Sequence, residues 1–358
     1  MLYGEEESRS RPRHLVRAAI GTARAKRRQA TRAVKVTAQS QNKEYKEQIM
    51  RALNFLKVNE PETRLDISLS LKSFQLLDEQ VHALYGDAKY PRLQYSAIDS
   101  RVIINTVPSA LHSVSARGLE DLISLSVRDT LIRLNKGDLC NNVVLVGDSD
   151  CSIVDEQGRI SRKTPDGGLQ YMNDEGKNAL TLIIEAGFSE SYQQLKKDVK
   201  LWLNQFECHT AMIIFLTENP RFRSPTNEGN NACSVTERGL FEGAMANAWR
   251  VSPFGPYCFR GHAWFGTMAT ATIEVLKKPT TGRIKAKKHE VVLNGQMMVE
   301  DDRLDLGLTI GDAFPPNCEE IEDIRAESVL LATNLVHKVL ATGAHNTAKT
   351  RFYNSFTR

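Results

Sequence analysis

The sequence predicts an α/β (α+β) fold in which a mixed sheet is covered by helices on both faces. The main observation is the order of elements between residues 109 and 217, which reads as a helix, a run of strands, a second helix and another strand. Helices and strands that alternate in this way are typical of layered domains. Composition agrees, because 41% hydrophobic residues in 358 suffice for one large domain or two modest ones.

The first expected elements precede and open this core. Residues 44–57 carry apolar side chains at helical spacing, and residues 92–108 read as two strands around a turn at Asp99. Residues 109–134 follow as a long amphipathic helix, in which Gly118 is a mild flaw.

The next elements are short apolar runs bounded by turn residues. We expect strands in residues 141–148, 151–160, 165–171 and 179–187. A helix over residues 191–206 places Leu195 and Trp202 on one face, and a strand over residues 210–217 follows it. This order calls for a mixed sheet with helices packed on it.

The remaining chain supplies a helix, a hairpin and a closing helix, over residues 234–249, 262–276, 289–295 and 321–342. We therefore expect a basic N-terminal arm, a core, a C-terminal extension packed on that core and a tail, with limits at residues 1–42, 43–218, 219–345 and 346–358.

Positive charge is concentrated at the N-terminus. Residues 1–36 hold ten Lys or Arg and three Glu, a local charge of +7 in a chain whose total is +4. Such an arm suits phosphate backbones or nuclear import receptors, and a solvated disordered tail explains the same composition. A second basic cluster, Lys277–Lys288, reads as a hairpin loop, for which a solvated turn is the simpler explanation.

Cysteine usage and hydropathy indicate the cellular setting. The six cysteines include no C-x-x-C pair, and the N-terminus has no signal-peptide pattern. The longest apolar runs fall short of the roughly 20 residues that span a bilayer. We expect a soluble, reduced, intracellular protein. The basic arm makes the nucleus a possible compartment. A homodimer is a possible oligomeric state.

Two carboxylates stand where strands are expected to start and end. Asp166 follows Pro165, which cannot donate a ladder hydrogen bond and so belongs at a strand start or edge. Glu185 ends the apolar run "LTLIIE". Carboxylates at neighbouring strand ends form the oxygen-rich site that Mg²⁺ favours. A turn-capping Asp and a Glu at the point where a strand surfaces account for the same spacing, so spacing alone leaves both possibilities open.

Four motifs together carry a family resemblance over residues 90–218. They are "LHSV" at the start of the long helix, "RKTPDGG" with Asp166, "LTLIIEAGFSESY" with Glu185, Gly187 and Ser189, and "LKKDVKLWL" with Asp198 and Trp202. This part of the chain is similar to uncharacterised fungal proteins with the restriction-endonuclease-like, PD-(D/E)XK nuclease fold. The resemblance implies an αβββαβ core and hydrolysis of DNA with Mg²⁺ or Mn²⁺ held by Asp166 and Glu185. The alternative is a catalytically inactive module of the same fold that binds nucleic acid or protein partners.

One position departs from the family pattern. The resemblance implies a lysine two residues after Glu185, where this chain has Gly187. In some members of the superfamily the lysine or its substitute comes from the following helix, where Gln193, Lys197 and Lys200 share one stripe. We therefore expect these three residues to act in catalysis, with Lys197 as the main candidate, although a solvated helix face explains each lysine equally well.

Further candidates are weaker. His112 and Glu120 lie on the long helix, from which such nucleases often add a group to the metal site, while Asp148 and Asp150 suit a turn as well as a third carboxylate. Ser189 follows from the motif alone. Cys208 and His209 have no partner at zinc spacing, and there is no phosphate-binding G-x-x-x-x-G-K-[ST] loop. Candidate nucleic-acid contacts are Arg24, Lys26, Arg27, Arg28 and Lys163.

Overall fold

A seven-stranded mixed sheet forms the centre of the computed structural model. The structure describes residues 45–57, 63–86, 88, 90–147, 149–154, 160–173, 175–176, 178–188, 190–206, 208–224, 235–279 and 282–355. The strands, in sheet order, are β14 (Gln296–Met297), β13 (Lys285–Leu293), β12 (Thr267–Lys277), β9 (Thr210–Asn219), β8 (Asn178–Gly187), β7 (Gly167–Met172) and β4 (Val143–Leu145). Strands β8 and β9 are parallel, and the other neighbours are antiparallel.

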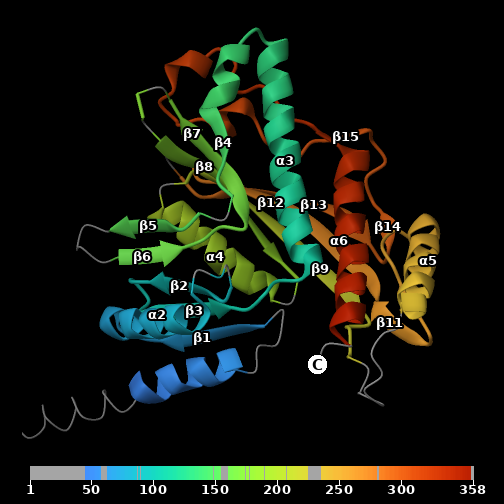
Figure 1. Cartoon of the computed structure of the whole chain (residues 1–358). Coiled ribbons are helices and arrows are strands. Elements are labelled where there is room, and N and C mark those ends of the chain that lie inside the picture. The colour runs from blue at the N-terminus through green and yellow to red at the C-terminus, as the bar shows by residue number, and fades with distance from the viewer. Residues whose placement is uncertain are drawn as a thin grey trace, which may run out of the picture.

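Helices cover both faces of this sheet (Figure 1). On one face α3 (Ala110–Arg133) and α6 (Thr333–Asn354) share a core with Ile184 and Ile214. On the other face α4 (Tyr192–Gln205) packs on Ile183 and Ile213. The alternation follows from the two-residue period of a strand, which sends neighbouring side chains to opposite faces.

Serine caps fix where two of these helices begin. Ser109 accepts a hydrogen bond from the backbone N–H of His112, and Ser191 accepts one from that of Gln194. Each cap satisfies one of the free N–H groups of a helix start. His112 therefore lies in the first turn of α3, at the edge of the sheet where β8 ends.

Close packing between helices explains the glycine at position 118, which is unfavourable in a helix. A Cβ atom added there would lie 2.5 Å from Cγ1 of Val339 on α6, which is closer than such atoms approach. Glycine therefore permits α3 and α6 to pack closely, and this contact outweighs the lower helix propensity of the residue.

A second sheet of five strands lies beside the first. Its order is β1 (Arg64–Ser68), β3 (Arg101–Asn105), β2 (Arg92–Ser96), β6 (Ile160–Lys163) and β5 (Cys151–Val154). It packs with α2 (Leu71–Tyr85) and the helix over residues 45–57 around a separate apolar cluster. Because β6 ends at Lys163 and β7 begins at Gly167, the chain passes from one sheet to the other within a few residues.

The predicted αβββαβ order is confirmed by α3, β4, β7, β8, α4 and β9. The strands β5 and β6 leave that order and join the second sheet instead. The C-terminal hairpin does more than pack on the core, because β12 pairs with β9 and so extends the central sheet.

The C-terminal end differs from the expected limits. The closing helix α6 begins at Thr333 and continues to Asn354, through most of the segment expected to be a tail. The other elements are α5 (Val235–Val251), β10 (Tyr257–Phe259), β11 (His262–Phe265), β15 (Arg303–Leu304), β16 (Leu331–Ala332) and the short 3-10 helices at Gly137–Asn142, Ile310–Ala313 and Glu319–Ile321. No helix in the described ranges is long and apolar enough to cross a membrane.

Candidate functional site

A polar cavity of about 70 Å³ lies where the two sheets meet. Four carboxylates line it, those of Asp166, Glu185, Glu190 and Asp198. The second sheet contributes Arg64 from β1 and Arg92 from β2, and α3 contributes His112. Such a concentration of ionisable groups in one pocket is typical of functional sites.

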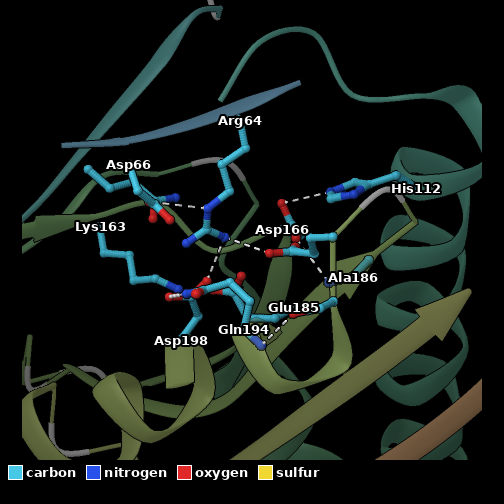
Figure 2. Close-up of polar contacts among 12 residues, drawn as sticks. Arg64, Asp66, His112, Lys163, Asp166, Glu185, Ala186, Gln194 and Asp198 are labelled. Carbon is cyan, nitrogen blue, oxygen red and sulfur yellow. Dashed lines mark hydrogen bonds and ion pairs between the residues drawn. The ribbon is translucent and has the colours of Figure 1, made fainter. Parts of the chain in front are cut away.

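Asp166 is held by hydrogen bonds with the two residues that flank Glu185. Its backbone N–H donates to the carbonyl of Ile184 at 3.2 Å, and its Oδ2 accepts from the N–H of Ala186 at 3.0 Å (Figure 2). The two carboxylates that the sequence singled out therefore stand on neighbouring chain segments and line the same cavity.

Glu185 is held by a buried lysine. Its Oε1 accepts from Nζ of Lys163 at 2.6 Å and from Nε1 of Trp202 on α4. The Lys163 side chain is only 2% exposed, and its ammonium lies 5.0 Å from the centre of the Trp202 ring. The assignment of Lys163 to a nucleic-acid surface does not fit this position, because a buried ammonium paired with Glu185 cannot reach a phosphate backbone outside.

The two carboxylates differ in their acidity. Burial would raise the pKa of Asp166, but the charge and hydrogen bond of His112, whose Nε2 lies 3.1 Å from Oδ1, lower it to about 2 together with the Ala186 N–H. Burial raises the pKa of Glu185, Lys163 opposes this, and the negative charges of Asp166 and Asp198 add to it. Asp166 therefore stays ionised, whereas negative charge on Glu185 is disfavoured.

Arg64 closes the pocket from the second sheet. Its Nη1 lies 2.5 Å from Oε2 of Glu190 and 2.8 Å from Oδ2 of Asp198. Burial raises the pKa of Glu190 to about 7, with Arg64 opposing and Asp198 and the other two carboxylates adding to the shift. Burial would raise the pKa of Asp198, but Lys163 and Arg64 lower it.

Side chains pack closely around Gly187, the position at which the family resemblance implies a lysine. A Cβ atom added there would lie 2.9 Å from Cγ of Leu195 on α4 and closer still to its Cδ1. A larger side chain there requires the Leu195 side chain or α4 to shift. The ammonium next to Glu185 comes from Lys163 at the end of β6 instead.

The lysines expected to replace it lie elsewhere. Lys197 and Lys200 are exposed on the outer face of α4, as is Gln193, and in the described part of the chain neither lysine contacts Asp166 or Glu185. The inner face of the helix carries Asp198 and Trp202. The stripe of Gln193, Lys197 and Lys200 faces solvent because the opposite stripe of α4 packs on the sheet.

Of the weaker candidates, His112 joins the site and Glu120 does not. The carboxylate of Glu120 is buried and accepts from Gly168 N at 2.8 Å, from Gly147 N at 3.2 Å and from Arg117 at 2.8 Å. It holds the start of β7 in place. Asp150 accepts from the hydroxyl of Thr164. The candidates Asp148, Ser189, Arg24, Lys26, Arg27 and Arg28 lie outside the described residues.

The donor set can be compared with what a divalent cation requires. Among the described residues there is no group of three or more His, Cys, Asp or Glu side chains arranged to hold a metal. Asp166 and Glu185 nevertheless offer two carboxylates, and Oε2 of Glu185 has no hydrogen-bond partner in the described ranges. Mg²⁺ binds through one or two carboxylates when waters and phosphate oxygens complete its shell, so the pair fits Mg²⁺ in this mode.

Sequence reasoning missed Arg64, Arg92 and Glu190. Arg64 lies in "RLDIS", whose alternating pattern indicates a strand but not which pocket that strand reaches. Its partner Asp198 is 134 residues away. No local signal connects them.

Comparisons with known proteins add little. No protein-family model and no curated protein matches the chain. Among solved structures it is similar to a protein of Anabaena variabilis described as a "putative nuclease belonging to DUF820", at 11% identity and a TM-score of 0.32. That similarity covers 70% of this chain and 92% of the other. Similarity at this level assigns no function. A functional assignment has to rest on the residues of the pocket.

Proposed function

We propose that this protein is a nuclease of the PD-(D/E)XK superfamily that hydrolyses phosphodiester bonds in DNA with Mg²⁺ or Mn²⁺. The observation that carries the proposal is the pairing of Asp166 and Glu185 in one pocket, with a buried ammonium on Glu185. The hydrogen bonds from Asp166 to the residues on either side of Glu185 keep this pair together.

Asp166 and Glu185 would hold the cation, which supplies a Lewis acid for the phosphoryl oxygen and lowers the pKa of a bound water. Asp166 suits this role because its low pKa keeps it ionised. The ammonium of Lys163 supplies the positive charge that the family pattern places at Gly187. Because Lys163 is buried behind Glu185, its ammonium would act through that carboxylate, by opposing the rise of its pKa and so favouring its charged form beside the cation.

The cations of the pocket favour an anionic substrate. Arg64 and Arg92 line the cavity beside the carboxylates, and His112 faces it from α3. The charge of Asp166 and their hydrogen bond raise the pKa of His112, against the effect of burial. These groups offset the repulsion that four carboxylates would exert on a phosphate.

The second candidate is an inactive module of the same fold. It is favoured by Oε1 of Glu185, which is already engaged by Lys163 and Trp202. It is also favoured by the lack of a three-ligand group among the described residues. This module would bind nucleic acid without cutting it.

Plasmid cleavage tests the proposal. Wild-type protein is incubated with supercoiled plasmid, single-stranded DNA or RNA in Mg²⁺, Mn²⁺ or EDTA, beside Asp166→Asn and Glu185→Gln. Asp121→Asn is the control, since this acid is exposed on α3. We expect metal-dependent cutting of DNA by wild type and control, and a loss of about a hundredfold or more in both site variants.

Two results would count against it. Cleavage that survives both Asp166→Asn and Glu185→Gln would show that the site is elsewhere. If wild-type protein binds DNA yet cuts it with neither metal, the inactive module is the better description.

A further inference from the structure

Basic side chains gather on the outer face of α4 and on the neighbouring β12–β13 hairpin. Five of them are exposed and Lys196 is half-buried. We call this the α4–hairpin surface, and it comprises Lys196, Lys197, Lys200, Lys278, Arg283 and Lys288.

Three contacts join the helix to the hairpin. At the C-terminal end of α4, Nζ of Lys278 donates to the carbonyl of Leu203 at 2.9 Å. Near its N-terminal end, Nζ of Lys288 lies 5.2 Å from the centre of the Tyr192 ring. Between them, Nζ of Lys196 lies 3.2 Å from a carboxylate oxygen of Glu274 on β12. The two basic segments, about 80 residues apart in sequence, therefore form one surface along the length of α4.

Little negative charge balances this surface. Glu274 is only 3% exposed, and Asp198, the one acid of α4 within the described residues, faces the pocket. An exposed acid, Glu290, lies two residues beyond Lys288 on β13. Like charges held together in this way repel one another, and binding to a polyanion relieves that repulsion while the side-chain cations release counterions condensed on the polyanion.

We infer that the α4–hairpin surface binds the phosphate backbone of a nucleic acid. This inference deepens the proposed function, because the partner is the substrate of the proposed nuclease. The same helix presents Asp198 to the pocket and Lys197 and Lys200 to solvent, so α4 connects this surface to the site. The two lysines thus act in backbone binding, which carries no sequence preference.

The test uses the full chain and fluorescence anisotropy with a duplex oligonucleotide, in EDTA and over a range of KCl concentrations. The variant K197Q/K200Q/R283Q removes three cations from the surface. The matched control R128Q/R133Q/K338Q removes three exposed cations from α3 and α6, which cover the opposite face of the sheet. The basic stretch 1–36 is present in both, so its contribution cancels.

We expect the surface variant to bind DNA at least tenfold more weakly at moderate salt. Its slope of log affinity against log salt should fall by up to about 2.7, which is 0.9 for each phosphate contact. The control should stay within about twofold of wild type, because its cations contact no phosphate. Thermal unfolding should be unchanged in both, since all six side chains are exposed.

An equal loss in the two triple variants would overturn the inference, because net charge alone would then explain binding. Unchanged DNA binding combined with weaker binding to phosphatidylserine vesicles would also overturn it, in favour of a membrane surface. Omission of divalent metal separates this test from the cleavage test. A surface defect with no wild-type cleavage would support the surface and count against the nuclease.

Discussion

Two buried glutamates on the neighbouring parallel strands β8 and β9 make an instructive comparison. Glu218 on β9 is closed on every side, because Arg351 Nη1 lies 2.9 and 3.0 Å from its two oxygens and Gly266 N–H donates to Oε1 at 2.6 Å. Within the part of the chain that the structure describes, Glu185 on β8 has hydrogen-bond partners on Oε1 alone, and it faces a cavity that three other carboxylates share.

The difference separates a structural ion pair from a candidate functional one. A buried charge is tolerated when a countercharge and hydrogen bonds reach both of its oxygens, as for Glu218. Around Glu185 burial and neighbouring negative charges raise the pKa in spite of Lys163, so the folded protein maintains unfavourable electrostatics there. Such strain is typical of sites that bind a cation or a substrate.

The largest expected effect is on the stability of the protein, when the ion pair of Arg351 and Glu218 is broken. Arg351→Met should lower the free energy of unfolding by about 3–5 kcal/mol, because it leaves the buried charge of Glu218 without its cation and with the Gly266 N–H as the remaining hydrogen-bond donor named above. Urea unfolding followed by fluorescence measures this. The double variant Arg351→Met/Glu218→Gln should recover part of the loss. A cost below about 1 kcal/mol for the single variant would remove the contrast between the two glutamates.

The ion pair of Lys163 and Glu185 should matter more for the rate of cleavage than for the stability of the fold. Lys163→Met is expected to slow cleavage about a hundredfold, which corresponds to about 2.7 kcal/mol of transition-state stabilisation. Lys72→Met, an exposed lysine on α2, is the control. Because Lys163→Met leaves Glu185 unpaired, Lys163→Met/Glu185→Ile is the matched variant for stability, and it should unfold at higher urea than the single variant. Cleavage by Lys163→Met at the wild-type rate would exclude a role for its ammonium.

A substitution at Gly187 tests the close packing of α4 on β8. Gly187→Ala should destabilise the protein by about 1–3 kcal/mol, because the added methyl group overlaps Leu195. Gly239→Ala on α5 is the matched control, since a Cβ there meets nothing within 4 Å, and it should stabilise by about 0.4–1 kcal/mol. Thermal unfolding measures the melting temperatures of the two variants, and that of Gly187→Ala should be the lower. Equal melting temperatures would mean that close packing does not exclude a side chain at Gly187.

The smallest effect concerns pH. The pKa of Glu190 is raised to about 7, so the folded protein binds a proton more tightly there than the unfolded chain does. Wild-type stability relative to Glu190→Gln should therefore fall as pH rises from about 4.5 to 7. Asp166 has the opposite sign, because its stabilisation is present above its ordinary pKa and is lost as pH falls toward 2. Urea unfolding at each pH measures this difference. A difference in free energy of unfolding between wild type and Glu190→Gln that stays constant across this pH range would contradict the raised pKa of Glu190.

Local patterns in the sequence determined the order of elements and the two central carboxylates. The helices that begin after Ser109 and Ser191 and the apolar runs of β8 and β9 depend on spacing within a few residues, so one sequence suffices to locate them. The same patterns place Asp166 just before one strand and Glu185 near the end of the next. Their interpretation as a metal-binding pair came from the family resemblance, because spacing alone leaves a turn cap and a surfacing strand end equally open.

Only the tertiary structure decided which positive charges reach those carboxylates. Lys163 lies in the site because the chain crosses from β6 to β7 beside Glu185, and Arg64 lies there because the second sheet packs over the first. Lys197 lies outside because the inner face of α4 is pressed against Gly187 through Leu195. Each of these placements depends on contacts between segments far apart in sequence, whose geometry no local periodicity encodes.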